Sequence, residues 1–394
     1  MRVLVATDSF KGSMTAVEAA RAAERGLRRA AAECGVEVDV DLCPIADGGE
    51  GTLDTLLAAD ATGAVRTERV TGPMGETIEA RWGLLGGGRL GVVEMAEAAG
   101  LTLVPDAKRD PTRTTTFGVG QLIGAALDAG VERVLLGLGG SATNDGGSGA
   151  AQALGVRFER AEGGVIDEPM RGGVLSEVGS VVFDGLRTEL AERRVAVEVA
   201  CDVTNPLCGE AGAAAVYGPQ KGATAEQVVS LDAGLANLAA RMAGSGGAMG
   251  EGLGEGLATG AFAGAGAAGG FGYGAVAMLG GTLRPGIELV LEAVGFDGRV
   301  RRADVVVTGE GRLDEQSLSG KATVGVAAAA RRAGVACVAL AGGVSGGAGA
   351  FAAAGIGEAV AIGEGLEVGE AMRRGAELME AGAAAWLGRR LGGG

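Results

Sequence analysis

The sequence of 394 residues contains no histidine, and this absence narrows the chemistry open to the protein. A chain without histidine has no Ser-His-Asp triad and no imidazole to act as a general base. Any proton must therefore be moved by Asp, Glu, Lys, Tyr or Cys. Cysteine is scarce as well, since the five present form no CxxC pair and no plausible disulfide framework. We expect them to be small buried hydrophobic residues.

Long apolar runs and clusters of basic residues are also missing. No stretch approaches the roughly 20 apolar residues that cross a bilayer, and no basic segment followed by an apolar one opens the chain. The 34 Lys and Arg residues face 49 Asp and Glu residues, which gives a net charge of -15. The Lys and Arg residues form no run longer than a pair. This argues against nucleic acid or an anionic membrane as a partner, and we expect a cytoplasmic protein.

Strand-then-helix units occur at both ends of the chain. The first helix opens with Thr15 and Glu18 in the spacing of a capping box and ends at Gly35, and a second helix is predicted over residues 50–59. Short apolar strands are predicted at five places: residues 2–6, 36–45, 303–309, 336–343 and 358–365. Such alternation predicts an α/β protein with a parallel, flavodoxin-like sheet.

Two of these strands lie at the start of the chain and three at its end, so we infer that a second α/β domain is inserted between them. The predicted flavodoxin-like domain is residues 1–69 and 288–394, and the insertion is residues 70–287. Within the insertion, strand-helix signals occur at 91–100, 133–140 and 195–203. The Gly- and Ala-rich stretch 243–280 fits either a mobile loop or tightly packed helices. We expect the active site in the cleft between the two domains.

Polar clusters recur just after the apolar strands, where parallel sheets bind ligands and helix N-termini offer free N–H groups to anions. The clusters are "TDSFKGS" (7–13), "ADGGEGT" (46–52), "GGSATNDGG" (139–147), "CDVTNP" (201–206), "GPQKGAT" (218–224) and "TGEGRLDEQSLSGKAT" (308–323). One such loop would be an ordinary turn or helix cap. Six of them predict two halves of one binding cleft.

Several nucleotide-binding patterns must be weighed for these loops. Gly137, Gly139 and Ala142 have the spacing G-x-G-x-x-A of a dinucleotide site, but the carboxylate of Asp145 would compete with the pyrophosphate for the same N–H groups. The pattern at 264–270 follows no buried strand, and no Walker A motif is present. The loop at 137–144 also resembles weakly the "GLGSSAA" loop of the GHMP kinases. Hydroxyls beside an Asp fit Mg-nucleotide or a hydroxylated substrate better, or a simple helix cap.

Taken together, the clusters resemble the type 1 glycerate kinases. The matching motifs occur in family order: "DSFKGSMTA", "PIADGGEGT", "GLGGSATNDGG", "CDVTNPLCGEAGAAAVYGPQKGAT", "GAGAAGG" and "VTGEGRLDEQSLSGK". This resemblance covers nearly the whole chain and agrees with a flavodoxin-like domain that carries an inserted α/β domain. The sequence departs from the family at Arg160, Ser317 and Thr323, which could alter loop rigidity but removes no carboxylate or lysine from the motifs.

The resemblance implies ATP-dependent phosphorylation of D-glycerate with Mg²⁺, and 2-phosphoglycerate rather than 3-phosphoglycerate as product. Phosphoryl transfer needs positive charge on the migrating phosphate, carboxylates for the metal and a group that takes the hydroxyl proton. The expected catalytic residues are Lys11, Asp47 and Asp314. The expected metal ligands are Asp145, Asp202 and Glu310. The expected substrate- and nucleotide-binding residues are Asp8, Ser9, Gly48, Gly49, Glu50, Gly139, Gly140, Ser141, Thr143, Asn144, Asn205, Lys221 and Lys321.

Two other functions stay open on the sequence alone. A Rossmann-type oxidoreductase is supported only by the two glycine patterns, and a non-catalytic hydroxy-acid sensor needs a cleft but no magnesium. Because histidine is absent, we expect a carboxylate, Asp47 or Asp314, to accept the proton. The sequence does not indicate the oligomeric state.

Overall fold

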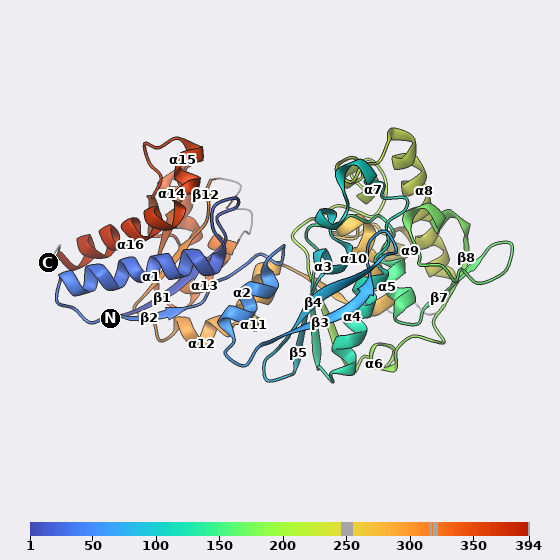
Figure 1. Cartoon of the computed structure of the whole chain (residues 1–394), viewed down its shortest axis with the longest axis horizontal. Coiled ribbons are helices and arrows are strands. Elements are labelled where there is room, and N and C mark those ends of the chain that lie inside the picture. Colours follow the sequence, from blue (N-terminus) through green and yellow to red (C-terminus); the bar gives the residue numbers. More distant parts are fainter. Residues whose placement is uncertain (246–254, 315–316, 318–321, 393–394) are drawn as a thin grey trace. The chain divides into compact units, whose positions relative to one another are not determined.

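The computed structural model describes residues 1–245, 255–314, 317 and 322–392. These residues form two units, each with its own main sheet and core (Figure 1). Unit 1 contains Met1–Asp47, Asp54–Ala61 and Ile287–Gly394, and unit 2 contains Gly48–Leu53 and Thr62–Gly286. The domain boundaries drawn from the sequence, and an active site in a cleft between the domains, stay predictions.

The main sheet of unit 1 has five parallel strands in the order β2, β1, β11, β13, β15. Numbered along this unit, the order is 2-1-3-4-5, which is flavodoxin-like, so the predicted fold class is confirmed. The strands are β1 (Arg2–Thr7), β2 (Asp39–Leu42), β11 (Val305–Gly309), β13 (Ala336–Ala341) and β15 (Glu358–Ala361). The second strand is shorter than predicted, because it pairs with β1 only from Asp39 to Leu42.

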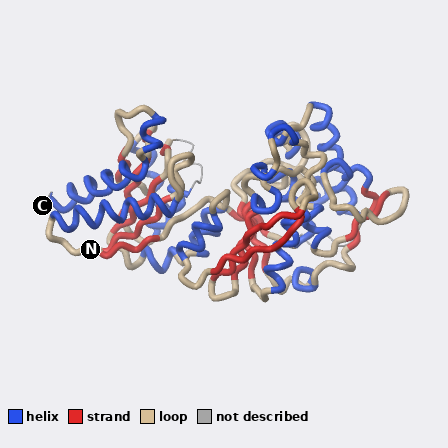
Figure 2. Tube along the Cα trace, in the orientation of Figure 1, coloured by secondary structure: helices blue, strands red, loops and turns tan. Residues whose placement is uncertain are grey.

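Helices surround this sheet (Figure 2). The other elements that lie wholly or mainly in unit 1 are α1 (Ala16–Glu33), α2 (Thr52–Ala59), α11 (Gly286–Ala293), α12 (Phe296–Val300), β12 (Arg312–Leu313), α13 (Ala322–Arg332), β14 (Gly343–Val344), α14 (Ala348–Ala354), α15 (Val368–Arg373) and α16 (Gly375–Gly392).

Helix α1 begins where the sequence predicts, because its capping box forms. The Thr15 hydroxyl accepts a hydrogen bond from the Glu18 amide (3.2 Å), and the Glu18 carboxylate accepts one from the Thr15 amide (2.8 Å). The helix then packs along α16 (Figure 1). At Gly26 the two backbones are so close that a Cβ would lie 2.1 Å from the carbonyl oxygen of Glu380. Only glycine permits this contact.

The main sheet of unit 2 has six strands in the order β10, β9, β6, β5, β4, β3. Its strands are β3 (Ala64–Thr71), β4 (Thr77–Leu85), β5 (Leu90–Glu94), β6 (Arg133–Gly137), β9 (Ala196–Ala200) and β10 (Thr282–Arg284). β5, β6, β9 and β10 are parallel, and β3, β4 and β5 form an antiparallel meander. The signals at 91–100, 133–140 and 195–203 correspond to β5, β6 and β9, whereas the β3-β4 hairpin is not predicted by the sequence pattern.

The other elements of unit 2 surround this sheet (Figure 2) or form a separate ribbon. They are α3 (Met95–Ala99), η1 (Leu101–Leu103), η2 (Asp106–Lys108), α4 (Phe117–Asp128), α5 (Ser148–Ala153), β7 (Arg157–Arg160), η3 (Gly172–Glu177), β8 (Val178–Val182), α6 (Thr188–Ala191), α7 (Ala213–Tyr217), η4 (Pro219–Lys221), α8 (Ala225–Gly244), α9 (Glu255–Thr259) and α10 (Ala267–Leu279). None of the helices in the described ranges is both long and apolar enough to cross a membrane.

The stretch 243–280 contains packed helix in the part that the structure describes, while residues 246–254 lie outside it. In α10 every residue from Gly269 to Leu279 is buried. Ala268, Gly269 and Gly270 have positive φ angles, and a Cβ on Gly269 would lie 2.0 Å from the carbonyl oxygen of Thr143. The glycine pattern at 264–270 therefore serves close packing on the turn that carries Thr143.

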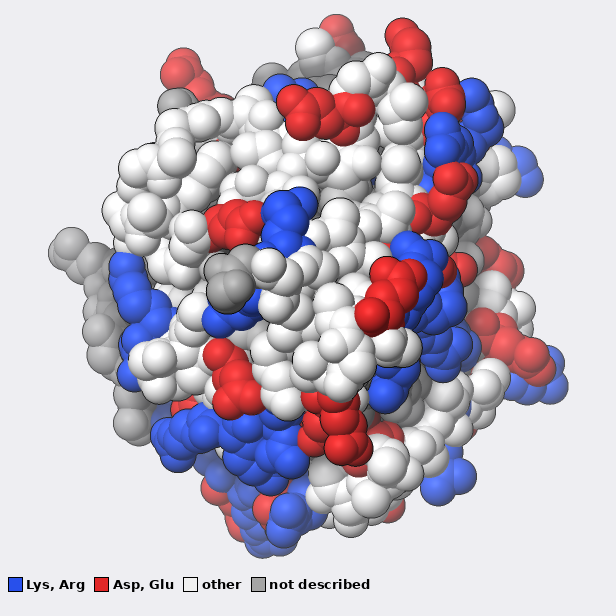
Figure 3. Space-filling model, turned by 90° about the vertical axis from the view of Figure 1, so that its left-hand side faces the viewer, with Lys and Arg blue, Asp and Glu red and all other residues white. Residues whose placement is uncertain are grey.

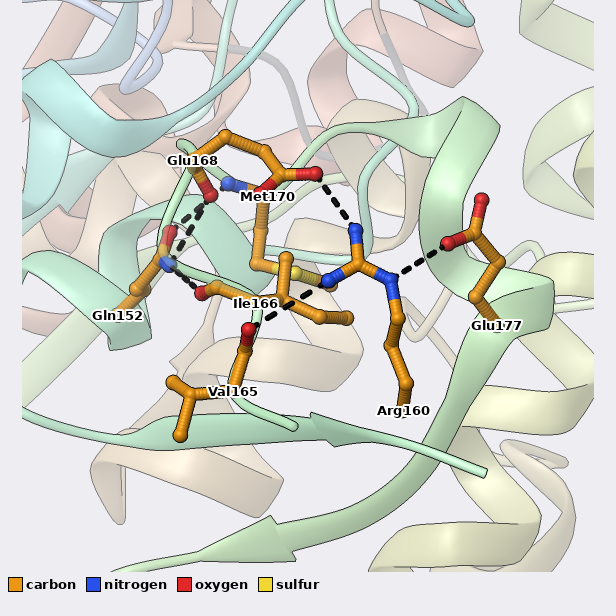
Figure 4. Close-up of polar contacts among 7 residues, drawn as sticks. All are labelled: Gln152, Arg160, Val165, Ile166, Glu168, Met170 and Glu177. Atoms are coloured by element: carbon orange, nitrogen blue, oxygen red, sulfur yellow. Dashed lines mark hydrogen bonds and ion pairs between the residues drawn. The ribbon is translucent and has the colours of Figure 1, made fainter. Parts of the chain in front are cut away.

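Arg160, where the resemblance leads us to expect Asp, ties the end of β7 to the segment that connects β7 with β8 (Figure 4). Its guanidinium donates to Glu168 Oε1 (2.7 Å), Glu177 Oε2 (3.0 Å) and the carbonyl oxygen of Val165 (3.4 Å). An aspartate here would instead face two carboxylates. The departure at Arg160 is therefore matched by its surroundings and lies in a structural cluster.

Gln152 on α5 completes this cluster (Figure 4). Its side-chain amide donates to the carbonyl oxygens of Ile166 (2.8 Å) and Glu168 (3.1 Å), and its Oε1 accepts from the Met170 amide (2.8 Å). One side chain thereby ties three backbone groups of the loop before η3 to α5.

We expect Gln152→Ala to lower the free energy of unfolding by about 1–3 kcal/mol, because three backbone groups lose a partner. Urea denaturation should show a lower midpoint with an unchanged slope, and kcat should not change. Gln220→Ala, at an exposed position on η4, is the control and should leave the midpoint in place. Equal midpoints for the two variants would contradict the structural role of Gln152.

Candidate active site

Four strands of the unit 1 sheet end at one pocket of about 570 Å³. Asp8 follows β1, Glu310 follows β11, Gly342 follows β13 and Ile362 follows β15, and all four line the pocket. Flavodoxin-like sheets bind ligands at this edge, beside the two strands at which the strand order reverses. In unit 1 those strands are β1 and β11, so Asp8 and Glu310 mark the expected ligand site.

Lys11, the predicted catalytic lysine, lies on a tight loop that lines the same pocket. The flanking Phe10 and Met14 are buried, and the amide of Phe10 donates to the carbonyl of Met14 (2.8 Å). Gly12 has a φ angle of +75°, and a Cβ there would lie 2.7 Å from Met372 Cε. Apolar anchors on either side thus present the exposed Lys11 at the pocket.

Three carboxylates, those of Asp8, Asp47 and Glu310, share this pocket with Lys11. Burial raises the pKa of Asp8 to about 7, the amide of Ser9 opposes the shift, and the negative charges of Asp47 and Glu310 add to it. The Ser9 amide donates to Asp8 Oδ1 at 2.6 Å. Acidic groups crowded in this way favour either a bound proton or a bound cation.

Asp314, the second candidate for the base, is not among the residues that line the pocket. Its carboxylate accepts a hydrogen bond from the Ser317 amide (3.2 Å) and forms an ion pair with Arg312 (3.3 Å). This arrangement favours a role in shaping the turn, and it leaves Asp47 as the candidate base that lines the pocket. Lys321 lies outside the described residues.

In unit 2, the polar turn after β6 packs against residues 48–50. A Cβ on Gly48 would lie 2.4 Å from Ala200 Cβ, and one on Gly139 would lie 2.9 Å from Gly49 Cα. Both turns therefore require glycine at these positions, because there is no room for a Cβ. Three further predicted binding residues are partly or fully exposed here: Glu50, Gly140 and Ser141.

Glu94, at the end of β5, is a functional candidate that the sequence analysis missed. It is 5% exposed, and its carboxylate accepts hydrogen bonds from the amides of Leu53 (2.6 Å) and Gly51 (3.3 Å). It therefore holds the start of α2 and the turn before it. An acidic residue directly after the apolar run "GVV" was the available signal.

Lys221 is buried beneath the turn after β6 instead of facing solvent. It is 2% exposed, and its Nζ donates to Ser141 Oγ (2.8 Å) and to the carbonyl oxygen of Thr143 (2.6 Å). Burial lowers the pKa of Lys221 to about 7, and the negative charge of Asp145 opposes that shift. Lys221 thus fixes the conformation of the turn.

Asp145 is fully buried in the same turn. Its carboxylate accepts from the Thr116 amide and hydroxyl (2.8 Å each), the Gly147 amide (3.1 Å) and the Gly149 amide (3.3 Å). Burial raises the pKa of Asp145, and these donors lower it. Enclosure by protein donors favours the helix-capping alternative, and the geometry gives no support to the predicted metal role.

Thr143 and Asn144 are likewise 0% exposed. The Oγ1 atom of Thr143 and both polar side-chain atoms of Asn144 are buried and have no hydrogen-bond partner among the residues that the structure describes. Unpaired buried polar atoms are costly, so they are found where a structure is held for a purpose other than stability. In this conformation neither side chain reaches solvent.

The two predicted residues after β9 differ in accessibility. Asp202 is exposed and accepts a hydrogen bond from the Gly286 amide (3.0 Å). Asn205 uses both ends of its side chain, because Nδ2 donates to the Ala211 carbonyl (2.8 Å) and Oδ1 accepts from the Tyr217 hydroxyl (2.7 Å). Asn205 therefore braces its loop, whereas Asp202 can meet a ligand.

No group of three or more Cys, Asp and Glu side chains within the described ranges is arranged to hold a metal ion by itself. On the end of unit 1 that Figure 3 shows, Lys and Arg side chains are interspersed with Asp and Glu, and a broad area carries neither. Lys and Arg side chains gather most densely toward the lower edge of this view.

The motifs and the geometry lead to one family. The family model described as "Glycerate kinase family" matches residues 3–389. The chain is 46% identical over 356 residues to a glycerate kinase of Halalkalibacterium halodurans, covering 88% of this chain and 86% of the relative. The chain belongs to the glycerate kinase family. The resemblance inferred from the motifs, and the prediction of an enzyme, are thereby confirmed.

Further relatives of the family agree. The chain is 40% identical to the glycerate 2-kinase of Escherichia coli strain K12, with 84% of this chain and 82% of that relative covered. A crystal structure assigned as glycerate kinase 2 from Salmonella typhimurium LT2 superposes with a TM-score of 0.85 at 39% identity, covering 100% of this chain and 99% of that one. Membership of a kinase family leaves the oxidoreductase alternative without support.

We expect Glu94→Ala to lower the free energy of unfolding by about 1–3 kcal/mol and to lower kcat/KM, because the turn before α2 loses its buried acceptor. Glu94→Gln keeps one acceptor oxygen and should be milder in both respects. Thermal unfolding and steady-state kinetics of the two variants provide the check. If the Ala and Gln variants behave alike, the two amide hydrogen bonds do not explain the contribution of Glu94 to stability and to kcat/KM.

Asp8→Asn should change how stability depends on pH. The pKa of Asp8 is raised to about 7, so its contribution to stability is present in full below pH 4 and is lost as the pH rises through 7. Asparagine stays neutral, and the variant should therefore melt higher than the wild type above pH 7 and similarly at pH 4. Melting curves from pH 4 to pH 9 test this, with the exposed Asp297→Asn as control. A difference in Tm that is the same at both ends of the range would refute it.

Proposed function

We propose that this protein transfers the γ-phosphoryl group of ATP to D-glycerate and forms 2-phosphoglycerate. The observation that carries the proposal is the unit 1 pocket, where Lys11 lies with Asp8, Asp47 and Glu310 at the strand pair β1 and β11. Membership of the glycerate kinase family supports the substrate class. The name of the E. coli relative, glycerate 2-kinase, supports the position of transfer.

In this proposal Lys11 and Asp47 act on the reacting atoms. The Lys11 ammonium contacts the migrating phosphoryl group and offsets the charge that its oxygens carry in the transition state. Asp47 accepts the proton of the attacking hydroxyl, a step that asks for little basicity because phosphoryl transfer passes through a loose transition state. Lys11 and Asp47 line one pocket, which supports this division of roles.

Mg²⁺ fits the carboxylates of this pocket when phosphate oxygens complete its coordination. The described residues hold no metal cage of their own, and Mg²⁺ in kinases is typically bound by one or two carboxylates together with substrate phosphates. Asp8 and Glu310 would hold it, since their mutual repulsion is relieved by a cation. When bound, Mg²⁺ neutralises charge on the transferred phosphate. Glu310 keeps its predicted metal role and Asp8 gains one.

Residues of unit 2 would hold the anionic parts of the substrates. The exposed Gly140 and the partly exposed Ser141 lie on a turn whose conformation Lys221 fixes from below. Asp202 is exposed after β9 and suits a substrate hydroxyl.

All five cysteines are free thiols, which supports a reducing, cytoplasmic compartment.

The proposal is tested by mixing the purified protein with ATP, Mg²⁺ and D-glycerate and following ADP release. Release should require both Mg²⁺ and D-glycerate, and phosphorus NMR should identify the product as 2-phosphoglycerate. Release that yields 3-phosphoglycerate would overturn the assigned position. Binding of glycerate without ADP release would overturn the kinase proposal in favour of a sensor.

Lys11→Ala should lower kcat by about 10²- to 10³-fold, the usual loss when a charge-stabilising donor is removed. The melting temperature should stay the same, because Lys11 is exposed on its loop. Lys108→Ala is a matched control, since Lys108 is an exposed lysine on η2 that lies outside the pocket. An unchanged kcat, or a large fall in Tm, would show that Lys11 does not have this role.

A further inference from the structure

The residues that line the unit 1 pocket change from charged to apolar along the order of the strands in the sheet. Its charged residues follow three neighbouring strands: Asp8 and Lys11 come after β1, Glu310 and Arg312 after β11, and Asp47 after β2. The pocket then runs past residues 342–345, after β13, to apolar side chains after β15. Since β1, β11, β13 and β15 are neighbours in the sheet, one end of the pocket is charged and the other apolar.

The apolar end is formed by residues to which the mechanism gives no task. They come from the loop after β15, from α15 and from the start of α16: Ile362, Leu366, Val368, Ala371, Met372 and Leu378. Val368 is 73% exposed and Met372 is 38% exposed, which is unusual for large apolar side chains. Exposed apolar side chains that line a pocket are stabilised when an apolar ligand surface covers them.

The length of the pocket distinguishes between the two substrates. From β1 to β15 there are three strand spacings, which together span about 14 Å. A three-carbon acid is much shorter than this and has almost no apolar surface. A nucleoside triphosphate is long, carries its charge at one end and ends in a flat, weakly polar ring at the other. Its polarity matches that of the pocket in order and in direction.

The apolar end is also in contact with the loop that carries Lys11. The hydroxyl of Ser13 donates to the carbonyl oxygen of Met372 (2.6 Å), and Gly12 leaves room for the Met372 side chain. At Gly375 a Cβ would lie 2.2 Å from Ser13 Oγ. A ring bound against Met372 would therefore pack on the same segment that supports the Lys11 loop.

We propose that the apolar end of this pocket, after β15 and on α15, binds the adenine ring of ATP, with the triphosphate extended along the strand ends toward Asp8 and Lys11. This assignment rests on the proposed kinase function and adds the location of the base to it. Leu366 and Val368 are then contact residues for the nucleotide, and the orientation of ATP in unit 1 is defined.

Binding of ATP and of inorganic tripolyphosphate, each measured by calorimetry with Mg²⁺, separates the base from the phosphates. Val368→Asn should weaken ATP binding about three- to tenfold and Leu366→Gln about ten- to thirtyfold, because apolar contact area is lost. Tripolyphosphate should bind both variants as it binds the wild type. Val229→Asn is the matched control, as Val229 is 71% exposed on α8 and is not among the residues that line this pocket. It should change neither affinity.

A photoaffinity experiment locates the ring directly. 8-Azido-ATP carries its reactive group on the base and should label the tryptic peptide 333–373, which contains both the 342–345 backbone and the apolar residues up to Met372. Excess ATP should suppress the label. Labelling of any other peptide, or equal loss of ATP and tripolyphosphate affinity in Val368→Asn, overturns the assignment of the base.

Different results would overturn the proposed function and the proposed location of the base. A wild-type protein that binds no ATP, or that releases no ADP with D-glycerate, overturns the proposed function and this assignment together. A protein that phosphorylates D-glycerate but is labelled by 8-azido-ATP outside residues 333–373 overturns the location of the base alone.

Discussion

The parallel pairing of β1 with β11 is the contact on which the pocket depends. It runs from Val3 opposite Val305 to Thr7 opposite Gly309, and it joins the start of the chain to residues 302 positions later. The register places Asp8 one residue beyond the end of one strand and Glu310 one residue beyond the end of the other. Two acidic residues from opposite ends of the sequence are thereby brought to the same pocket.

This proximity has an electrostatic cost that a ligand would remove. In the isolated protein, burial and the neighbouring carboxylates keep the pKa of Asp8 near neutrality, at about 7. A bound cation reverses that effect, because it stabilises the ionised form of each carboxylate. Without a bound cation, the ionised carboxylates therefore make the folded protein less stable than neutral side chains at these positions would. Shifted pKa values of this kind are common at binding sites.

In unit 2, buried polar and charged side chains support the backbone of a turn. The turn after β6 is held by Lys221, which is buried below it, and by the buried Asp145 within it, and both side chains hydrogen-bond to backbone groups of the turn. Buried charged groups stabilise a structure only when their hydrogen bonds are satisfied, and here most of the donors and acceptors are backbone groups. The residues that look most like ligands in the sequence thus support the turn, and the exposed backbone near Gly140 is left for contact.

Local patterns in the sequence determined much of this protein. Alternating strands and helices predicted the flavodoxin-like sheet, Thr15 and Glu18 predicted the start of α1, and the ordered motifs indicated the family. Each of these features depends on residues close together in the chain, so the spacing and type of the residues suffice to predict it. The β3-β4 hairpin escaped prediction because several of its residues, such as Val65, are exposed and give no apolar period.

Only the tertiary structure decided which polar residues line the pocket and which are buried elsewhere. Asp47 and Asp314 look equivalent in sequence, yet only Asp47 lines the pocket. Lys11 and Lys221 both follow polar motifs, yet the first is exposed and the second is buried. The apolar end of the pocket had no motif, since its side chains acquire a shared surface only when β15 joins β13 in the sheet. Exposure and proximity are set by contacts between segments far apart in the chain, and residue type and spacing alone do not encode them.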